Sequence, residues 1–89
     1  MDYDRLLEEY RKVWNNRRLE SIDNQSEMVL KDAIRRELLD ENSHPRARKG
    51  LLEKYYSATK RLLASSLNDR DKVSLLQLHV DIVLNLEKR

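Results

Sequence analysis

Apolar residues recur along this chain at three- and four-residue spacing, in blocks that short polar breaks separate. This spacing places the apolar side chains of each block on one face of an α-helix. Four such blocks predict helices over about residues 3–19, 25–40, 45–65 and 70–87. We therefore expect a single all-α domain, residues 1–89, folded as an antiparallel four-helix bundle with up-down-up-down topology.

Residues that favour helix starts stand in the breaks. Asp2 precedes the first block, and an acceptor side chain at that position can bind the free N–H groups of the first turn. Ser43 or His44 precedes Pro45, which suits a first helical turn because no N–H is needed there. Asn68 or Asp69 ends the last break and can cap the fourth helix. The breaks thus support the same four helices.

The last helix is unusual because it is apolar on two opposite faces. One stripe comprises Val73, Leu76, Val80, Val83 and Leu84, and the other comprises Leu75, Leu78, Ile82 and Leu86. A helix at the edge of a small domain needs only one apolar face. The second face must be covered by the rest of the chain, by a second copy or by another protein. We expect the stripe of Leu75, Leu78, Ile82 and Leu86 to be a partner interface, with Tyr56 at its rim.

The same segment also alternates between apolar and polar residues from Leu76 to Leu86, as a β-strand does. A lone strand would have no partner within the chain and would need the edge of another molecule. We predict a helix for residues 75–86, with an intermolecular strand as the alternative.

Composition supports a helical, well-solvated protein. The chain has one glycine and one proline, too few for the tight turns of a β-rich fold. Its 18 basic and 16 acidic residues nearly cancel, which favours solvated helix faces over a nucleic-acid footprint. No cysteine is present, no run of about 18 apolar residues occurs, and the acidic start does not resemble a signal peptide. We expect a cytoplasmic protein with no membrane contact.

No motif with a chemical mechanism is found. His44 and His79 are the two histidines, and their spacing matches no zinc-binding pattern. The serines have no base at a recognisable spacing, and the sequence has no glycine-rich phosphate loop. We therefore expect no enzymatic activity, no metal and no cofactor.

A nucleic-acid-binding module is one alternative function. Its candidate residues are Arg46, Arg48 and Lys49 at the start of the third predicted helix, together with Arg35 and Arg36. Backbone N–H groups at a helix start also favour anions, so this cluster is the best candidate for a phosphate contact.

The order of features resembles a known family. Residues 6–18 read LLEEYRKVWNNRR, residues 56–63 read YSATKRLL, and residues 70–73 read RDKV. Over about residues 3–76 this is similar to the helical domain of GINS subunits. The resemblance implies a non-catalytic subunit of a replication scaffold that contacts other replication proteins. At the level of fold alone, the chain is also similar to the small four-helix bacteriocin immunity proteins.

Taken together, the sequence favours a non-enzymatic interaction or scaffold module. We expect a homodimer or a subunit of a larger assembly, in which the last helix docks to the partner. A GINS-like scaffold subunit, a nucleic-acid-binding module and an immunity-type bundle are the alternatives.

Overall fold

The structure, a computed structural model, describes residues 2–14, 25–40, 44–47 and 49–88. It contains the helices α1 (Tyr3–Trp14), α2 (Ser26–Leu38), α3 (Leu51–Ala64) and α4 (Asp69–Glu87), and a short 3-10 helix η1 (Pro45–Ala47). The all-α prediction is confirmed, and the part of the chain described here holds no strand. Residues 75–86 are helical throughout, so the strand alternative is wrong.

The predicted helix starts are largely correct. Asp2 Oδ1 accepts a hydrogen bond from the backbone N–H of Arg5 at 3.2 Å, and Asn68 Oδ1 accepts one from that of Asp71 at 2.8 Å. These side chains satisfy N–H groups that have no partner within the helix. The predicted end of the first helix near residue 19 lies outside the described residues.

The third helix begins later than predicted. Gly50 is its N-cap, with an extended backbone (φ −65°, ψ 158°), and the helix starts at Leu51. Glycine is a poor helix former, so the helix begins just after it rather than running through it. His44 Nδ1 accepts a hydrogen bond from the backbone N–H of Arg46 at 3.2 Å and therefore caps η1 instead of α3.

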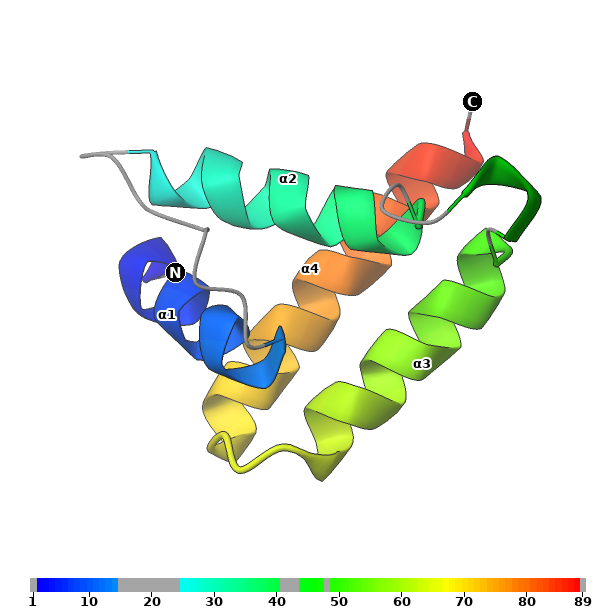
Figure 1. Cartoon of the computed structure of the whole chain (residues 1–89). Coiled ribbons are helices and arrows are strands. Elements are labelled where there is room, and N and C mark those ends of the chain that lie inside the picture. The colour runs from blue at the N-terminus through cyan, green and yellow to red at the C-terminus, as the bar shows by residue number, and fades with distance from the viewer. Residues whose placement is uncertain (1, 15–24, 41–43, 48, 89) are drawn as a thin grey trace.

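The helices α1 and α2 form one pair, and their direction corrects the up-down-up-down prediction. The Ser26 hydroxyl at the start of α2 donates a hydrogen bond to Asp4 at the start of α1, and Lys31 lies 5.6 Å from the Tyr3 ring centroid. The two helices therefore run in the same direction (Figure 1).

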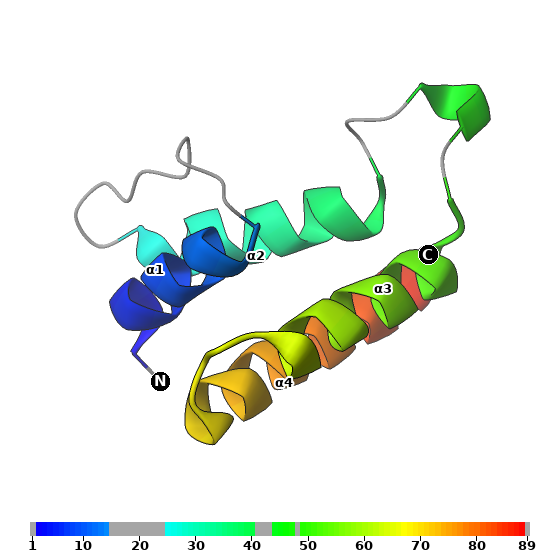
Figure 2. The same ribbon diagram turned by 60° about the horizontal axis from the view of Figure 1, so that its bottom comes forward.

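The helices α3 and α4 form the second pair. They lie side by side and antiparallel, as predicted (Figures 1 and 2), and α2 crosses α4 (Figure 1). Lys72 Nζ donates to the backbone oxygen of Leu63 at 3.2 Å, which places the end of α3 beside the start of α4. The fold is thus a parallel pair packed across an antiparallel hairpin.

The core lies where α4 meets the other three long helices. Its buried side chains are Leu6, Leu7, Tyr10, Leu30, Ile34, Leu38, Leu62, Leu67, Leu75, Leu78 and Val83. In α2 the members recur every four residues, which gives a single row along one face. The helix α4 contacts each of α1, α2 and α3. The core is therefore closed around α4.

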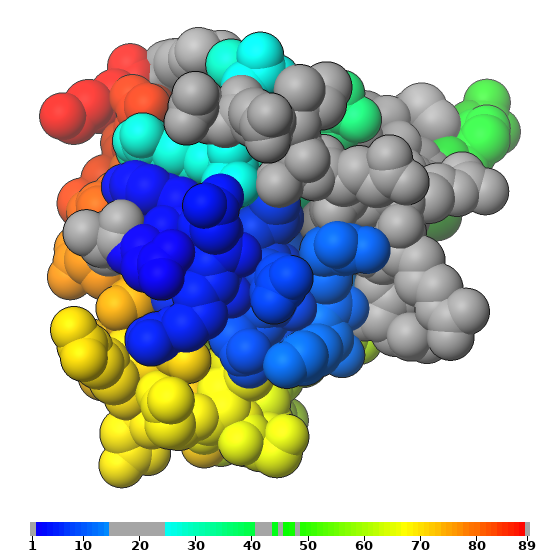
Figure 3. Space-filling model, turned by 90° about the vertical axis from the view of Figure 1, so that its left-hand side faces the viewer, coloured from blue at the N-terminus to red at the C-terminus, as the bar shows by residue number. Residues whose placement is uncertain are grey.

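A buried carboxylate fixes α1 to the start of α4. The Asp71 side chain is only 4% exposed and forms an ion pair with Arg5. Figure 3 shows α1, in blue, lying against the yellow segment that contains the start of α4. A buried charge is costly unless it is paired, so this contact holds the two helices in register.

Truncation of the core should separate a buried from an exposed leucine on the same helix. Leu75 is fully buried, whereas Leu84 is 53% exposed. We expect Leu75→Ala to lower the free energy of unfolding by about 2–5 kcal/mol, and Leu84→Ala to lower it by less than about 1 kcal/mol. Urea unfolding followed by circular dichroism measures both. Equal losses would contradict the central position of α4.

Candidate functional site

The predicted partner stripe on α4 belongs largely to the protein's own core. Leu75 and Leu78 are buried, and Ile82 and Leu86 are partly buried against the same cluster. The reason is that these residues of α4 pack within the core that α4 forms with the other helices of the same chain. In this fold Leu75 and Leu78 are not accessible to a partner, which corrects the sequence-based placement of the interface on this stripe.

The opposite stripe of α4 is exposed only in part, because Val83 is buried in the core and Leu76 packs against it. Val73 and Leu84 are 64% and 53% exposed, and Leu76 and Val80 are half-buried. On α3, Leu52, Tyr56 and Leu63 are also exposed and lie within about 40° of one another around the helix. Since α3 and α4 are antiparallel neighbours, these residues share the side that faces away from α1 and α2. We call this surface the outer face; it comprises Leu52, Tyr56, Leu63, Val73 and Leu84.

The predicted nucleic-acid residues are divided between two elements. Arg35 and Arg36 on α2 both pair with Asp32, at 2.9 and 3.0 Å. Arg46 lies in η1 and Lys49 lies just before α3, while Arg48 falls outside the described residues. The expected placement of this cluster at the start of a helix is wrong, because α3 begins only at Leu51.

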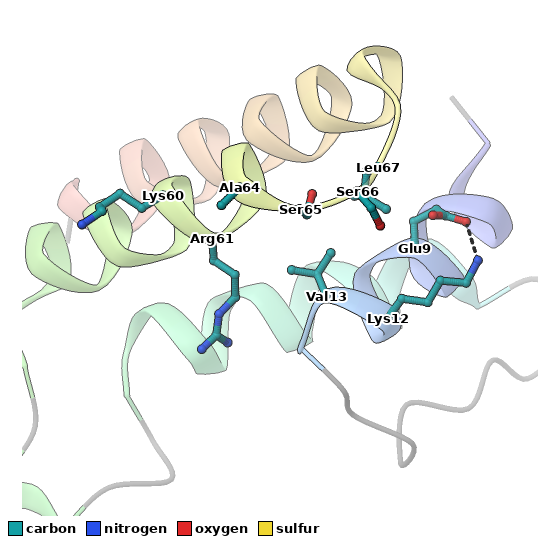
Figure 4. Close-up of a pocket in the computed structure, with 9 residues that line it drawn as sticks. All are labelled: Glu9, Lys12, Val13, Lys60, Arg61, Ala64, Ser65, Ser66 and Leu67. Carbon is teal, nitrogen blue, oxygen red and sulfur yellow. Dashed lines mark hydrogen bonds and ion pairs between the residues drawn. The ribbon is translucent and has the colours of Figure 1, made fainter.

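A cleft opens between α1 and α3, which make only slight contact with each other. Its larger part has a volume of about 770 Å³ and is shown in Figure 4. The lining residues come from α1, from the end of α3 and from the turn before α4: Glu9, Lys12, Val13, Lys60, Arg61, Ala64, Ser65, Ser66 and Leu67. The lining combines basic side chains with small apolar ones.

A smaller pocket of about 230 Å³ continues the cleft toward α2. It is lined by Trp14, Glu37, Lys49, Lys54, Ser57, Ala58 and Arg61. We call the two pockets together the α1/α3 cleft. Arg61 lines both of them, and its guanidinium lies 5.4 Å from the centroid of the Trp14 ring. Arg61 therefore stands between the two parts of the cleft.

Lys54 is held in place at the wall of the smaller pocket. Its ammonium lies 2.9 Å from Glu37 Oε1 and 3.6 Å from Asp40 Oδ1. Burial acts to lower the pKa of Lys54, but the hydrogen bond to Glu37 and the charges of both carboxylates outweigh burial and raise the pKa. Asp40 adopts a left-handed backbone (φ 55°) just after α2, and its Oδ2 also accepts from the backbone N–H of Lys49. The Lys54 side chain is thus charged and fixed in position.

A buried histidine lies at the end of an aromatic stack. His79 on α4 is fully buried, and its Nδ1–H donates to the backbone oxygen of Leu75 at 2.7 Å. Trp14 stacks on Tyr10 with ring centroids 4.4 Å apart, and lies 5.9 Å from the His79 ring. His79 Nε2 has no hydrogen-bond partner among the described residues. The ring is therefore the neutral Nδ1–H tautomer.

Burial also changes the titration of this cluster. It lowers the pKa of His79, while the hydrogen bond with Leu75 and the charge of Glu37 act in the opposite direction. Burial raises the pKa of Tyr10, and the nearby Glu37 charge adds to that rise. Both residues are thus kept neutral near neutral pH.

Sequence reasoning missed the α1/α3 cleft. Trp14 and Arg61 are 47 positions apart and no pattern links them. The spacing of Tyr10 and Trp14 shows a shared helix face, but the same spacing is typical of ordinary core residues. The groups that line the cleft come close together because α1 and α3 both pack on α4. The cleft stays open because α1 and α3 make only slight contact with each other.

Two further properties bear on function. Among the described residues, no group of three or more histidine, aspartate or glutamate side chains is arranged to hold a metal ion. None of the helices described is both long and apolar enough to cross a membrane.

The fold and these surfaces define a small all-α bundle protein with an exposed apolar outer face and a basic cleft. The chain matches the YoyC family over residues 1–89, and it belongs to that family. It is 40% identical over 82 residues to the uncharacterized protein YoyC of Bacillus subtilis (strain 168), covering 91% of this chain and 86% of that protein. No solved structure matches the chain.

This family membership corrects the resemblance to GINS subunits. The YoyC match covers the whole chain, whereas the GINS-like segments are short amphipathic stretches of mixed charge, which unrelated helices also produce. The replication role that the resemblance implied is therefore withdrawn. The predicted cytoplasmic location stays a prediction.

Titration of His79 should make stability depend on pH. Its pKa is lower in the folded state than in the unfolded state, so below the unfolded value, about 6.5, the unfolded chain binds more protons. Above about pH 6.5, we expect the contribution of His79 to the free energy of unfolding to be constant. As the pH falls, that contribution should decrease by up to about 1.4 kcal/mol per pH unit.

Urea unfolding at a series of pH values between 8 and 5 measures this slope. His79→Gln should remove it, because glutamine does not titrate. His44→Gln is the matched control, since the His44 side chain is exposed, and should retain the slope. An unchanged slope in His79→Gln would show that other groups cause the pH dependence.

Proposed function

We propose that this protein is a non-enzymatic interaction module that associates with a second copy of itself through the outer face. The observation that carries the proposal is the group of large apolar side chains exposed together on α3 and α4. Tyr56, Leu63 and Val73 are each between 58% and 64% exposed. Contiguous apolar surface of this kind is typical of protein-protein contacts.

Charge and composition also suit self-association. The formal net charge is only +2, so two copies repel each other weakly. Acidic and basic residues both border the outer face, including Glu53, Lys60 and Asp81. Because a two-fold axis places the same patch on both partners, a border of mixed sign avoids a ring of like charges. Tyr56 also offers a large amphipathic ring, which is common in interfaces.

Two lysines on the outer face should dissociate the dimer without unfolding the chain. We expect Val73→Lys combined with Leu84→Lys to reduce the mass in solution from twice 10.7 kDa to the monomer value. Both side chains are exposed, so the helical circular dichroism should stay unchanged. Light scattering coupled to size-exclusion chromatography measures the mass.

Met28→Lys is the matched control. Met28 is 64% exposed but lies on α2, away from the outer face, so this variant should remain dimeric. A wild-type protein that is monomeric at high concentration would show that self-association is wrong and leave the outer face for a different protein.

A further inference from the structure

The α1/α3 cleft concentrates positive charge. Its described lining residues include five cations, namely Lys12, Lys49, Lys54, Lys60 and Arg61, against two carboxylates, Glu9 and Glu37. The whole chain has a formal net charge of only +2. The rest of the surface is therefore close to neutral, and the cleft attracts anions selectively.

Arg61 is the cation best suited to hold an anion. It forms no ion pair with any described residue, and its guanidinium lies 5.4 Å from the centroid of the Trp14 ring. Stacking on an aromatic ring holds the planar guanidinium in one orientation. A guanidinium presents two parallel N–H donors that match the oxygens of a carboxylate or a phosphate. In Figure 4 the Arg61 side chain extends from α3 into the cleft.

The other cations differ from Arg61 in ways that define the ligand. Lys12 is neutralised by Glu9 at 3.0 Å, and Lys54 by Glu37 and Asp40. Lys60 lies over the Tyr56 ring at 5.2 Å, with no carboxylate partner among the described residues. Arg61 and Lys60 are thus the two cations of the cleft that meet both conditions. Neither forms an ion pair with a described carboxylate, and each lies against an aromatic ring.

The cleft also contains apolar surface beside these cations. Val13, Ala64 and Leu67 line the larger pocket together with Arg61. The smaller pocket, about 230 Å³, is below the usual size of a site for a drug-like molecule and suits a compact polar group. A ligand with an acidic group and a short apolar body would therefore fill both parts.

We propose that the α1/α3 cleft binds a small organic anion, and that Arg61 holds its carboxylate or phosphate group. Arg61 lies away from the outer face, because Arg61 and Leu63 project from α3 about 160° apart, although Lys60 lines the cleft and also contacts Tyr56 of the outer face. The two proposals therefore stand or fall independently.

The single tryptophan of the chain reports on this site. Trp14 lies under Arg61, so movement of the guanidinium toward a ligand should change the fluorescence of Trp14. Inorganic pyrophosphate and citrate, titrated separately, represent the phosphate and carboxylate forms of the ligand. We expect a saturable change with at least one of them, and the stronger probe identifies which form the site prefers.

Substitution of Arg61 tests its role. Arg61→Gln should weaken binding at least about tenfold, as the loss of charged hydrogen bonds does, and Arg61→Lys should restore only part of the affinity because it lacks the planar fork. Arg70→Gln is the matched control, since Arg70 is an exposed cation on α4 that lines neither pocket. This variant should bind as the wild type does. Calorimetry repeats the comparison without relying on Trp14.

Two results would overturn the proposal. One is the lack of saturation by either probe up to about 10 mM, which is weaker than millimolar affinity. The other is equal affinity of the wild type and Arg61→Gln in calorimetry. Either result leaves the cleft as solvated surface, whatever the mass measurement shows about the outer face.

Discussion

The rest of the structure depends on the burial of α4 against the other three long helices. Leu75, Leu78 and Val83 of α4 are buried in the core, and α4 contacts each of α1, α2 and α3. A chain of 89 residues without cysteine has no cross-link to compensate for a small core. Sharing one central helix lets each of the other helices bury its single apolar face. The arrangement leaves Val73 and Leu84 of α4 exposed and keeps α1 and α3 apart, which creates both the outer face and the α1/α3 cleft.

The buried polar groups are placed where they limit how the helices can pack. Asp71 needs Arg5, because an unpaired carboxylate would be costly at its 4% exposure. His79 keeps its Nδ1–H on the Leu75 carbonyl and packs against aromatic rings from α1. Both groups connect α4 with α1 through contacts that a shifted helix would lose. Trp14 stacks on the buried Tyr10 and in turn contacts the guanidinium of Arg61 at the surface.

Much of the fold could be predicted because helix formation is local. The three- and four-residue spacing of apolar residues indicated all four helices. Asp2 caps α1 as predicted, and of the two candidates Asn68 and Asp69 it is Asn68 that caps α4. The relative direction of α1 and α2 was predicted wrongly, since the helix pattern carries no information about how a long connection runs. The GINS resemblance was wrong for a related reason, because mixed-charge amphipathic helices look alike in unrelated proteins.

The sequence by itself determined that α4 has two apolar stripes. Contact with one neighbouring helix covers only one of them, so the other must be covered by the rest of the chain, by a second copy or by another protein. Only the tertiary structure decided which residues of each stripe lie inside, namely Leu75 and Leu78 of one stripe and Val83 of the other. The two stripes have similar composition, so their hydrophobic free energies do not distinguish them. What distinguishes them is the position of α1, α2 and α3, with the Arg5–Asp71 pair on the same side of α4 as Leu75. The cleft is likewise a product of tertiary packing, because Trp14 and Arg61 are brought together by helices that each pack on α4.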